Sequence, residues 1–472
     1  MHHALDHIIG HGPVHFIGIG GISMSGLARI LLDRGIPVTG SDRAESGVVH
    51  ELRALGATIT VPHDAACIGS QTLVVYTAAI ASDNPELLEA RQRGIACMDR
   101  GHFLGQLALG YDRNYAISGT HGKTTSTGML ASVLLDAGTD PTIHIGGVLP
   151  LIGGNTRIGG RSTFLMEACE YKNSYHGFFP THALILNIEA DHLDFFRDLD
   201  DILDSFAAYT RNIAADGELV LNLDDAGCRS LLSRIDRPYA AYALQAADAG
   251  MAGASLPVAL YRAENISYES GCGRFDVVLG TERLATVRLC VPGAHNASNA
   301  LGCFALAHRA GLAADAVADG LSHFTGTGRR FEIKGTVRGA TLIDDYAHHP
   351  TAVEVNLATA RALTRGRIVC VFQPHTYTRT RKLLPEFAKA LAMADRTLLV
   401  DIYAAREPDL GQVHARDLVE GINACGGDAR YAASFPEAAR MAAEGLCEGD
   451  LVLTMGAGDV YRVGELMLAA EA

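Results

Sequence analysis

Residues 114–138 read NYAISGTHGKTTSTGMLASVLLDAG, and this stretch decides the class of fold. Its first part, NYAIS, is a short apolar run of the kind that forms a buried parallel strand. Its last part, from Thr125, has the length and composition of a helix. A strand, a glycine-rich loop and a helix in this order are the context of a phosphate-binding loop in an α/β fold. The loop residues are Gly119, Thr120, His121, Gly122, Lys123, Thr124 and Thr125.

The chemistry of the loop suits a nucleotide phosphate. Its glycines let backbone N–H groups close round the phosphates, Lys123 would contact the outer phosphates, and the Thr124 hydroxyl would bind Mg²⁺. The loop is shorter than the usual GxxxxGKT pattern, because Ile117 stands where that pattern has its first glycine. The alternative is a surface turn that carries a lysine by chance.

Short apolar runs alternate with helix-length segments along the rest of the chain, which predicts doubly wound α/β domains. With 472 residues the chain has room for about three domains. We place them at 1–104, 105–325 and 326–472, and we expect short alternating runs between about 245 and 290 to add a small antiparallel element to the middle domain. The predicted strands are HFIGIGG (15–21), TLVVYTAAI (72–80), FLMEACE (164–170), ALILNIEAD (183–191), TLIDDYA (341–347), GRIVCVFQP (366–374), TLLVDIYA (397–404) and DLVLTMGAGD (450–459).

Net charge, cysteine spacing and hydropathy exclude several classes of protein. The net charge of −14, from 39 basic and 53 acidic residues, argues against a non-specific nucleic-acid binder. Ten scattered cysteines without a CxxC pair argue against a disulfide framework or a zinc knuckle. We find neither a signal peptide nor a membrane span of ~18 apolar residues, so we expect a cytoplasmic protein that does not enter a membrane. The five histidines of residues 2–15 match no helical face, which favours a flexible start over a metal site.

A second glycine-rich loop lies near the N-terminus. Gly18, Gly20, Gly21 and Ser23 lie in the segment from His15 to Gly26, which we interpret as a strand, a tight glycine turn and a helix. Asp42 stands where an acidic residue closes the second strand of a Rossmann unit. The dinucleotide fingerprint is incomplete, because Ser23 occupies its third glycine position. The loop still suits a diphosphate at a helix N-terminus, so the chain has two candidate diphosphate sites.

Acidic residues and a histidine follow two further predicted strands. Glu167 and Glu170 end one of them, and Asp191, His192 and Asp194 follow the other. Carboxyl ends of parallel strands meet at the ligand-binding edge of a sheet, where these groups could hold Mg²⁺. Helix capping is the alternative for Asp191.

The last third of the chain carries three more polar clusters. Arg329 and Arg330 follow a Gly-Thr-Gly turn and could bind phosphate oxygens, although a solvated linker is the alternative. The segment DDYAHHP (344–350) packs two acids, a tyrosine and two histidines at a strand end. HTYTRTR (375–381) offers Arg379 and Arg381 to an anionic group.

Together these motifs resemble one family, the Mur ligases of bacterial peptidoglycan synthesis. The resemblance runs from about residue 14 to 460, with eight motifs in the order of that family. They are HFIGIGG with SGLA, GTHGKTT, NIEADHLD, HNASNA, GTGRRFE, DDYAHHPTAV, FQPHTYTRTR and DIYAAREP.

The resemblance implies a three-domain α/β enzyme with a Rossmann-like UDP-sugar domain, a central ATPase and a C-terminal Rossmann-like domain. It implies an ATP-dependent amide ligase that activates a carboxylate as an acyl phosphate, with ATP and Mg²⁺ as cofactors and UDP-N-acetylmuramate and L-alanine as substrates. We expect a monomer or homodimer with no nucleic-acid partner.

The resemblance also implies roles for individual residues. Lys123 would contact the ATP phosphates, and Thr124, Glu167 and His192 would bind magnesium. The other implied nucleotide-site residues are Asn296 and Asn299 by the adenine, and Arg330 and Asp345 at the phosphates and ribose.

For the remaining substrates we expect His348 to take the proton of the amine or to hold the amino acid's carboxylate. Glu170 lies in EACEYKNSY, where some members read EADESD, and would face the muramoyl end. Thr376 replaces an arginine of some members, so Arg379 is expected to carry more of the substrate's charge.

Three rival interpretations stay open. A sibling ligase that recycles a murein tripeptide shares GTHGKTT and the C-terminal motifs. A NAD-dependent oxidoreductase would explain Gly18, Gly20 and Asp42, but it leaves GTHGKTT without a role. A nucleotide-binding regulatory module without catalysis would give the strand-end acids, such as Glu167 and Glu170, no role.

Overall fold

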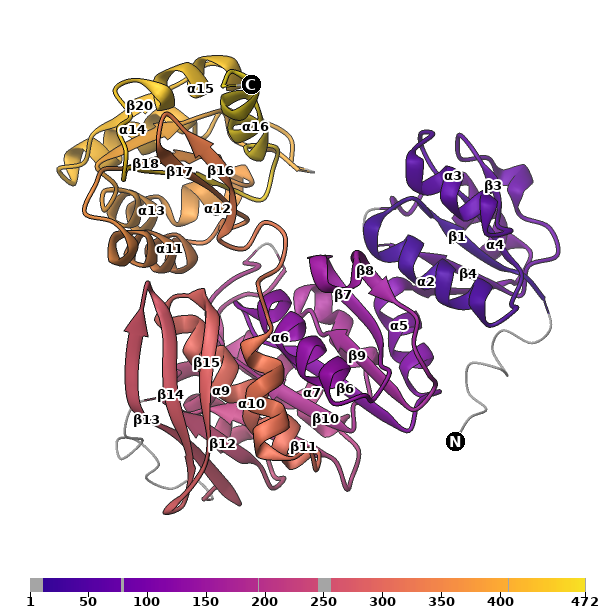
Figure 1. Ribbon diagram of the computed structural model, residues 1–472. Helices are drawn as coiled ribbons and strands as arrows, with labels where there is room; N and C mark the ends of the chain where they lie inside the picture. The colour runs from indigo at the N-terminus through magenta and orange to yellow at the C-terminus, as the bar shows by residue number, and fades with distance from the viewer. Residues whose placement is uncertain (1–11, 78–79, 194, 245–255, 406, 472) are drawn as a thin grey trace. The chain divides into compact units, whose positions relative to one another are not determined.

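The computed structural model describes residues 12–77, 80–193, 195–244, 256–405 and 407–471. His2, His3, His7, His11, Asp194 and Arg406 lie outside the described residues. The chain is an α/β protein with three sheets (Figure 1). Its residues group into two compact units. The first holds the described residues up to Glu264 with Asp276–Thr286 and Asn299–His323, and the second holds Asn265–Phe275, Val287–Ser298 and the described residues from Phe324 on.

The N-terminal sheet belongs to the first unit and has the order β3-β2-β1-β4-β5, with all neighbours parallel. The order reverses between β1 and β4, which is the switch point where such sheets bind ligands. Apolar side chains cover both faces, and all four residues of β1 are buried. The elements are β1 Val14–Ile17, α2 Ile22–Asp33, β2 Val38–Ser41, α3 Gly47–Ala54, β3 Thr58–Thr60, β4 Leu73–Tyr76, α4 Pro85–Gln92, β5 Ala96–Asp99 and α5 Arg100–Ala108.

The middle sheet has ten strands in the order β15-β14-β13-β12-β11-β10-β6-β9-β7-β8. From β13 to β7 neighbouring strands are parallel, and β8 closes the edge antiparallel to β7. The strands are β6 Arg113–Ser118, β7 Thr142–Leu149, β8 Gly154–Arg157, β9 Thr163–Glu167, β10 His182–Ile185, β11 Glu218–Asn222, β12 Ala240–Ala243, β13 Ala259–Glu269, β14 Cys272–Leu279 and β15 Glu282–Pro292. The helices are α6 Lys123–Asp136, α7 Leu199–Arg211, α8 Ala226–Leu231, α9 Ala294–Arg309 and α10 Ala314–Ser322.

Two features of this sheet refine the sequence expectations. The alternating runs after residue 256 form hairpins that extend the middle sheet through β13, β14 and β15. The strand predicted over 183–191 ends at Ile185. Residues 187–189 leave the ladder because their backbone and side chains bond to the glycine-rich loop at 119–121 instead.

The C-terminal sheet lies in the second unit, in the order β16-β17-β21-β18-β19-β20, with β16 antiparallel at one edge. One core packs α11, α13 and α14 on one face, and a second core packs α15 and α16 on the other. The strands are β16 Glu332–Val337, β17 Ala340–Asp345, β18 Ile368–Phe372, β19 Arg396–Leu399, β20 Ala429–Tyr431 and β21 Leu451–Met455. The helices are α11 Pro350–Leu363, α12 Tyr377–Lys382, α13 Leu384–Leu391, α14 Ala415–Ala424, α15 Phe435–Ala443 and α16 Tyr461–Ala469.

The three sheets confirm the predicted three-domain α/β fold class, and the predicted boundaries at 104 and 326 stay predictions. Across the described ranges, every helix is too short or too polar to cross a membrane.

Candidate active site

The glycine-rich loop of the middle domain joins the end of β6 to the start of α6. Gly122 is the N-cap of α6 in a left-handed conformation, with φ 82°. A Cβ atom at Gly122 would lie 3.1 Å from the side-chain oxygen of Asn299, and one at Gly119 would lie 3.1 Å from the backbone of Asn187. A side chain at either position would therefore crowd its neighbours, and it would also have to adopt a positive φ that favours glycine. The side chain of Asn299 therefore lies against the loop at Gly122.

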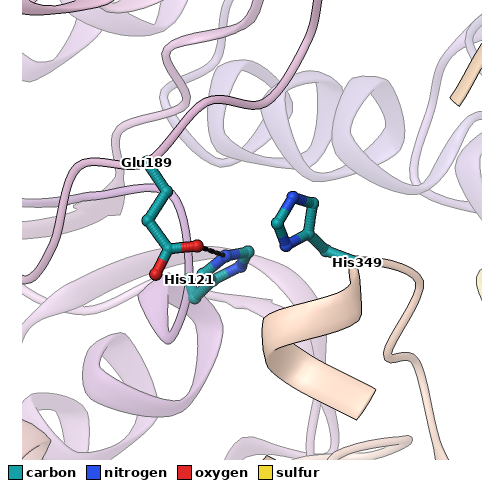
Figure 2. Close-up of side chains that lie close together, drawn as sticks. All are labelled: His121, Glu189 and His349. Carbon is teal, nitrogen blue, oxygen red and sulfur yellow. Dashed lines mark hydrogen bonds and ion pairs between the residues drawn. The ribbon is translucent and has the colours of Figure 1, made fainter. Parts of the chain in front are cut away.

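His121 is bonded to the segment that follows β10. Its Nε2 lies 3.2 Å from a carboxylate oxygen of Glu189, and Figure 2 shows the two side chains pointing toward each other. Its backbone N–H donates to the side-chain oxygen of Asn187 at 2.7 Å. The loop thus has a fixed conformation on the side that faces this segment.

Lys123 is folded over the loop and paired with Glu170. Its Nζ lies 2.8 Å from Glu170 Oε2 and also donates to the carbonyl oxygens of Gly119 and Thr120. Burial acts to lower the pKa of Lys123, but the Glu170 carboxylate outweighs it and the pKa is raised. The pKa of Glu170 is lowered, because Lys123 and His192 outweigh the opposite effect of burial. Both groups therefore stay charged at neutral pH, and the Lys123 ammonium group is paired with the Glu170 carboxylate.

Thr124 and Glu167 form a second pair at the same edge. The Thr124 hydroxyl lies 3.1 Å from Glu167 Oε2, and this oxygen also accepts the backbone N–H of Gly146 at 2.9 Å. A hydroxyl and a carboxylate are hard oxygen ligands of the kind that Mg²⁺ prefers. The residues present therefore fit a magnesium ion.

His192, the third predicted metal ligand, lies beside Glu170 rather than in the Thr124–Glu167 pair. Its Nε2 is 3.6 Å from Glu170 Oε1, and its ring lies 4.7 Å from the ring of Tyr171. The backbone of His192 has a φ of 54°, which is uncommon for a residue with a side chain. Asp191 does not cap a helix in the described part of the chain, since the next helix, α7, is capped by Asp198. The sequence did not predict that Glu170 faces both Lys123 and His192.

The N-terminal glycine loop is closed by Asp42. One oxygen of this carboxylate accepts the N–H of Gly20 at 2.8 Å, and the N–H groups of Gly18 and Ile19 donate to Ser41 O. Gly21 then caps α2. Asp42 thus shapes the loop by binding its backbone.

Ser23, in the first turn of α2, has two partners that the sequence did not reveal. Arg100 donates to its hydroxyl oxygen at 3.0 Å, and His144 Nε2 lies 2.7 Å from the same oxygen. Burial, helped by the charge of Arg100, lowers the pKa of His144 to about 3, so the imidazole is neutral. The other ring nitrogen of His144, Nδ1, lies 3.1 Å from the hydroxyl oxygen of Thr156.

In the second unit, Asp345 ends β17 and organises the turn around it. Its carboxylate accepts the backbone N–H groups of Phe331 at 2.7 Å and Ala347 at 2.6 Å. Burial raises the pKa of Asp345, against the charge of Arg330. The Arg330 guanidinium lies over the ring of Tyr346 at 5.1 Å.

Arg329 is a structural residue rather than part of a solvated linker. It donates to Asp344 at 2.9 Å and to the carbonyl oxygen of Gly456 at 2.8 Å, and its guanidinium lies between the rings of Tyr346 and Tyr461.

His348 and Arg379, two residues of this unit that were predicted to contact the substrates, both lie near His375. His348 Nδ1 is 2.9 Å from the carbonyl oxygen of Tyr346, and its ring centroid lies 5.5 Å from that of His375. Arg379 donates to His375 Nδ1 at 3.1 Å, so the unprotonated nitrogen of His375 faces the arginine. The sequence pointed to His348 and Arg379, while His375 was only part of a quoted motif.

The two asparagines of the HNASNA motif both lie on α9. The Asn296 side chain donates to the carbonyl oxygen of Pro292 at 2.7 Å, while Asn299 lies against Gly122. Arg100 and His144 were missed by sequence reasoning, because their partners are far away in the chain. Asn187 was only part of the quoted motif NIEADHLD and was given no role.

Comparison with known proteins covers almost the whole chain. Three family models match in succession. They are described as the Mur ligase family catalytic domain (residues 13–112), the Mur ligase middle domain (117–307) and the Mur ligase glutamate ligase domain (329–458).

Two curated relatives carry the same name. The chain is 46% identical to the UDP-N-acetylmuramate–L-alanine ligase of Clostridium perfringens, over 96% of this chain and 97% of that protein. It is also 46% identical to the Clostridium novyi protein of the same name, over 97% of each.

Solved structures agree on the fold. A UDP-N-acetylmuramate–alanine ligase from Thermotoga maritima superposes with a TM-score of 0.79 at 29% identity, covering 98% of this chain and 99% of that one. A murein peptide ligase from Psychrobacter arcticus superposes with a TM-score of 0.69 at 25% identity, covering 97% and 98%.

Proposed function

The chain belongs to the Mur ligase family, and we propose that it joins L-alanine to the muramoyl carboxylate of UDP-N-acetylmuramate in the cytoplasm, during peptidoglycan synthesis. ATP drives the reaction and leaves as ADP and phosphate. The observation that carries the proposal is the 46% identity, over nearly the full length of both chains, to relatives with this activity in their name. Membership of this family removes the NAD-dependent oxidoreductase as an interpretation.

The first step is transfer of the γ-phosphoryl group of ATP to the muramoyl carboxylate. Both reactants are anionic, so the protein must offset their repulsion by positioned positive charge. Lys123 is suited to this, because Glu170 keeps it protonated in a buried place. The loop residues Gly119 to Thr125 are proposed to hold the phosphates, and Asn299 to hold the nucleotide next to Gly122.

Magnesium would supply further charge neutralisation when it is bound. Thr124 and Glu167 are the residues proposed to hold it, since their oxygens already converge. His192 is proposed to bind a second ion together with Glu170 or to orient that carboxylate. Glu170 would then exchange its contact with Lys123 for a contact with metal or substrate.

The second step is attack of the amine of alanine on the acyl carbon of the acyl phosphate. The C–N bond forms, phosphate leaves with the electron pair of the C–O bond, and the amine loses one proton. We propose His348 as the group that takes this proton or holds the carboxylate of alanine, and Arg379 as a contact for substrate charge. Arg330, with Asp345 and Asn296, is proposed to contact ATP, as the family resemblance implies.

The UDP part of the substrate is proposed to bind at Gly18, Gly20, Gly21 and Ser23. The N-terminus of α2 and the guanidinium of Arg100 supply the positive field for a diphosphate there. Asp42 is proposed to act by keeping Gly20 in its turn.

The test is phosphate release by the purified protein with Mg-ATP and UDP-N-acetylmuramate, with and without L-alanine, while mass spectrometry follows the sugar nucleotide. We expect alanine-dependent release and a product heavier by one alanine residue. Release that depends on a murein tripeptide instead would make the chain a recycling ligase. No release with either substrate would favour a non-catalytic module.

A further inference from the structure

The phosphate loop is bound along one side by the segment after β10. The Asn187 side chain accepts the N–H of His121 at 2.7 Å and donates to the carbonyl oxygen of the same residue at 3.1 Å. The backbone oxygen of Asn187 accepts the N–H of Thr120 at 3.0 Å. This side chain has one possible orientation, because exchange of its oxygen and nitrogen would put two donors and two acceptors face to face.

Glu189 strengthens the same attachment. Its backbone N–H donates to the Thr120 hydroxyl at 2.9 Å, and its carboxylate lies 3.2 Å from the ring of His121. Gly119 packs closely on the same segment, since a Cβ atom there would lie 3.1 Å from the backbone N and O of Asn187. Residues 119–121 are therefore held by hydrogen bonds and close packing along residues 187–189.

This attachment explains how a shortened loop keeps its shape. In a GxxxxGKT loop several successive backbone N–H groups surround the phosphates. Here the N–H groups of Thr120 and His121 point to Asn187. The donors for phosphate must then come from later residues, at the start of α6, together with Lys123.

We propose that Asn187 is a positioning residue for ATP: its carboxamide fixes the backbone of His121 and so sets the conformation in which Gly122, Lys123 and Thr124 receive the phosphates. The inference rests on the proposed function. The residue acts through the loop, and its loss should change the affinity for nucleotide while leaving the UDP-sugar site, built on β1 and α2, intact.

The experiment compares three variants of the full chain. Asn187→Ala removes both side-chain hydrogen bonds. Asn187→Asp has the same shape and keeps the acceptor for the His121 N–H, but it loses the donor. Asn114→Ala is the control, because Asn114 is another middle-domain asparagine with two side-chain hydrogen bonds: it accepts the N–H of Thr181 at 2.9 Å and donates to Ala108 O at 3.4 Å. Asn114 is buried whereas Asn187 is half-buried, and no hydrogen bond joins Asn114 to the loop.

The first measurement is the Kd for a non-hydrolysable ATP analogue with magnesium, by calorimetry. The second is the set of KM values for ATP and UDP-N-acetylmuramate. We expect Asn187→Ala to raise the Kd and the KM for ATP about tenfold or more, with the KM for the sugar nucleotide within twofold of wild type. Asn187→Asp should also raise both values, because its second carboxylate oxygen faces the carbonyl oxygen of His121, and Asn114→Ala should leave them unchanged even if its melting temperature falls.

Nucleotide affinity within twofold of wild type in both Asn187 variants would overturn the inference. So would an equal rise in the KM of both substrates, because that is the result of general destabilisation. If Asn187→Ala does not fold, the isosteric Asn187→Asp decides. A wild-type protein that binds the analogue but shows no alanine-dependent turnover would refute the proposed function alone, while the ratio of Kd values would still decide the role of Asn187.

Discussion

At the scale of the residue, the pair of Lys123 and Glu170 is the clearest electrostatic feature of the site. The folded-state pKa of Glu170 lies below its ordinary value of 4.5. The pair therefore stabilises the fold fully above pH 4.5, and this stabilisation is lost as the pH falls through the lower folded-state pKa. We expect Glu170→Gln to lower the free energy of unfolding by about 3 kcal/mol at pH 7, because it leaves a buried lysine charge without its partner. The difference from wild type should shrink below pH 4.5.

Urea unfolding at a series of pH values checks this prediction. Glu51→Gln is the control, since Glu51 forms an exposed ion pair with Arg29 and its loss should change stability by less than about 1 kcal/mol. A Glu170→Gln effect that stays constant from pH 7 to below pH 4 would show that the carboxylate charge is not what stabilises the fold.

At the scale of the element, the loop between β6 and α6 needs a glycine at position 119, and Gly138 is a control position for the effect of backbone conformation alone. Gly119 has a φ of 137°, and a Cβ there would press on the Asn187 backbone. Gly138, which follows α6, has a φ of 69° and open space around it. We expect Gly138→Ala to destabilise the protein by about 1 kcal/mol without changing the KM for ATP.

Gly119→Ala, in contrast, should raise the KM for ATP about tenfold or more, because the added methyl group separates the loop from Asn187. Steady-state kinetics with both variants, at saturating UDP-N-acetylmuramate, makes the comparison. Equal KM values for ATP in the two variants would mean that contact with residue 187 does not matter for nucleotide binding.

The elements also show how far sequence reasoning reaches. The period and length of the apolar runs predicted β6 and α6. The strand-end rule placed Glu167 at the ligand-binding edge of the sheet, where it lies 3.1 Å from the hydroxyl of Thr124. The same reasoning failed where a long-range side-chain contact decides the outcome. The strand over 183–191 stops early because Asn187 bonds to residues more than sixty positions away. Periodicity carries no information on such pairings.

At the scale of the whole molecule, the division into two compact units predicts two steps of unfolding. The second unit has its own cores on both faces of its sheet, built from residues between Val337 and Met467. The phosphate loop and its Asn187 segment belong to the first unit. Calorimetric scans of the full chain should therefore show two transitions, and a nucleotide held by the loop should raise the transition of the first unit.

The size of the expected shift follows from binding linkage. A non-hydrolysable ATP analogue at 100 times its Kd stabilises the state that binds it by about 2.7 kcal/mol, which corresponds to roughly 5 °C for a unit of this size. Asn187→Ala, scanned at the same analogue concentration, should lose most of that shift and leave the second transition where it was. If both transitions rise together in the wild type, the nucleotide is contacted by both units or they unfold as one, and the stabilisation then reports on closure of the whole molecule rather than on the loop.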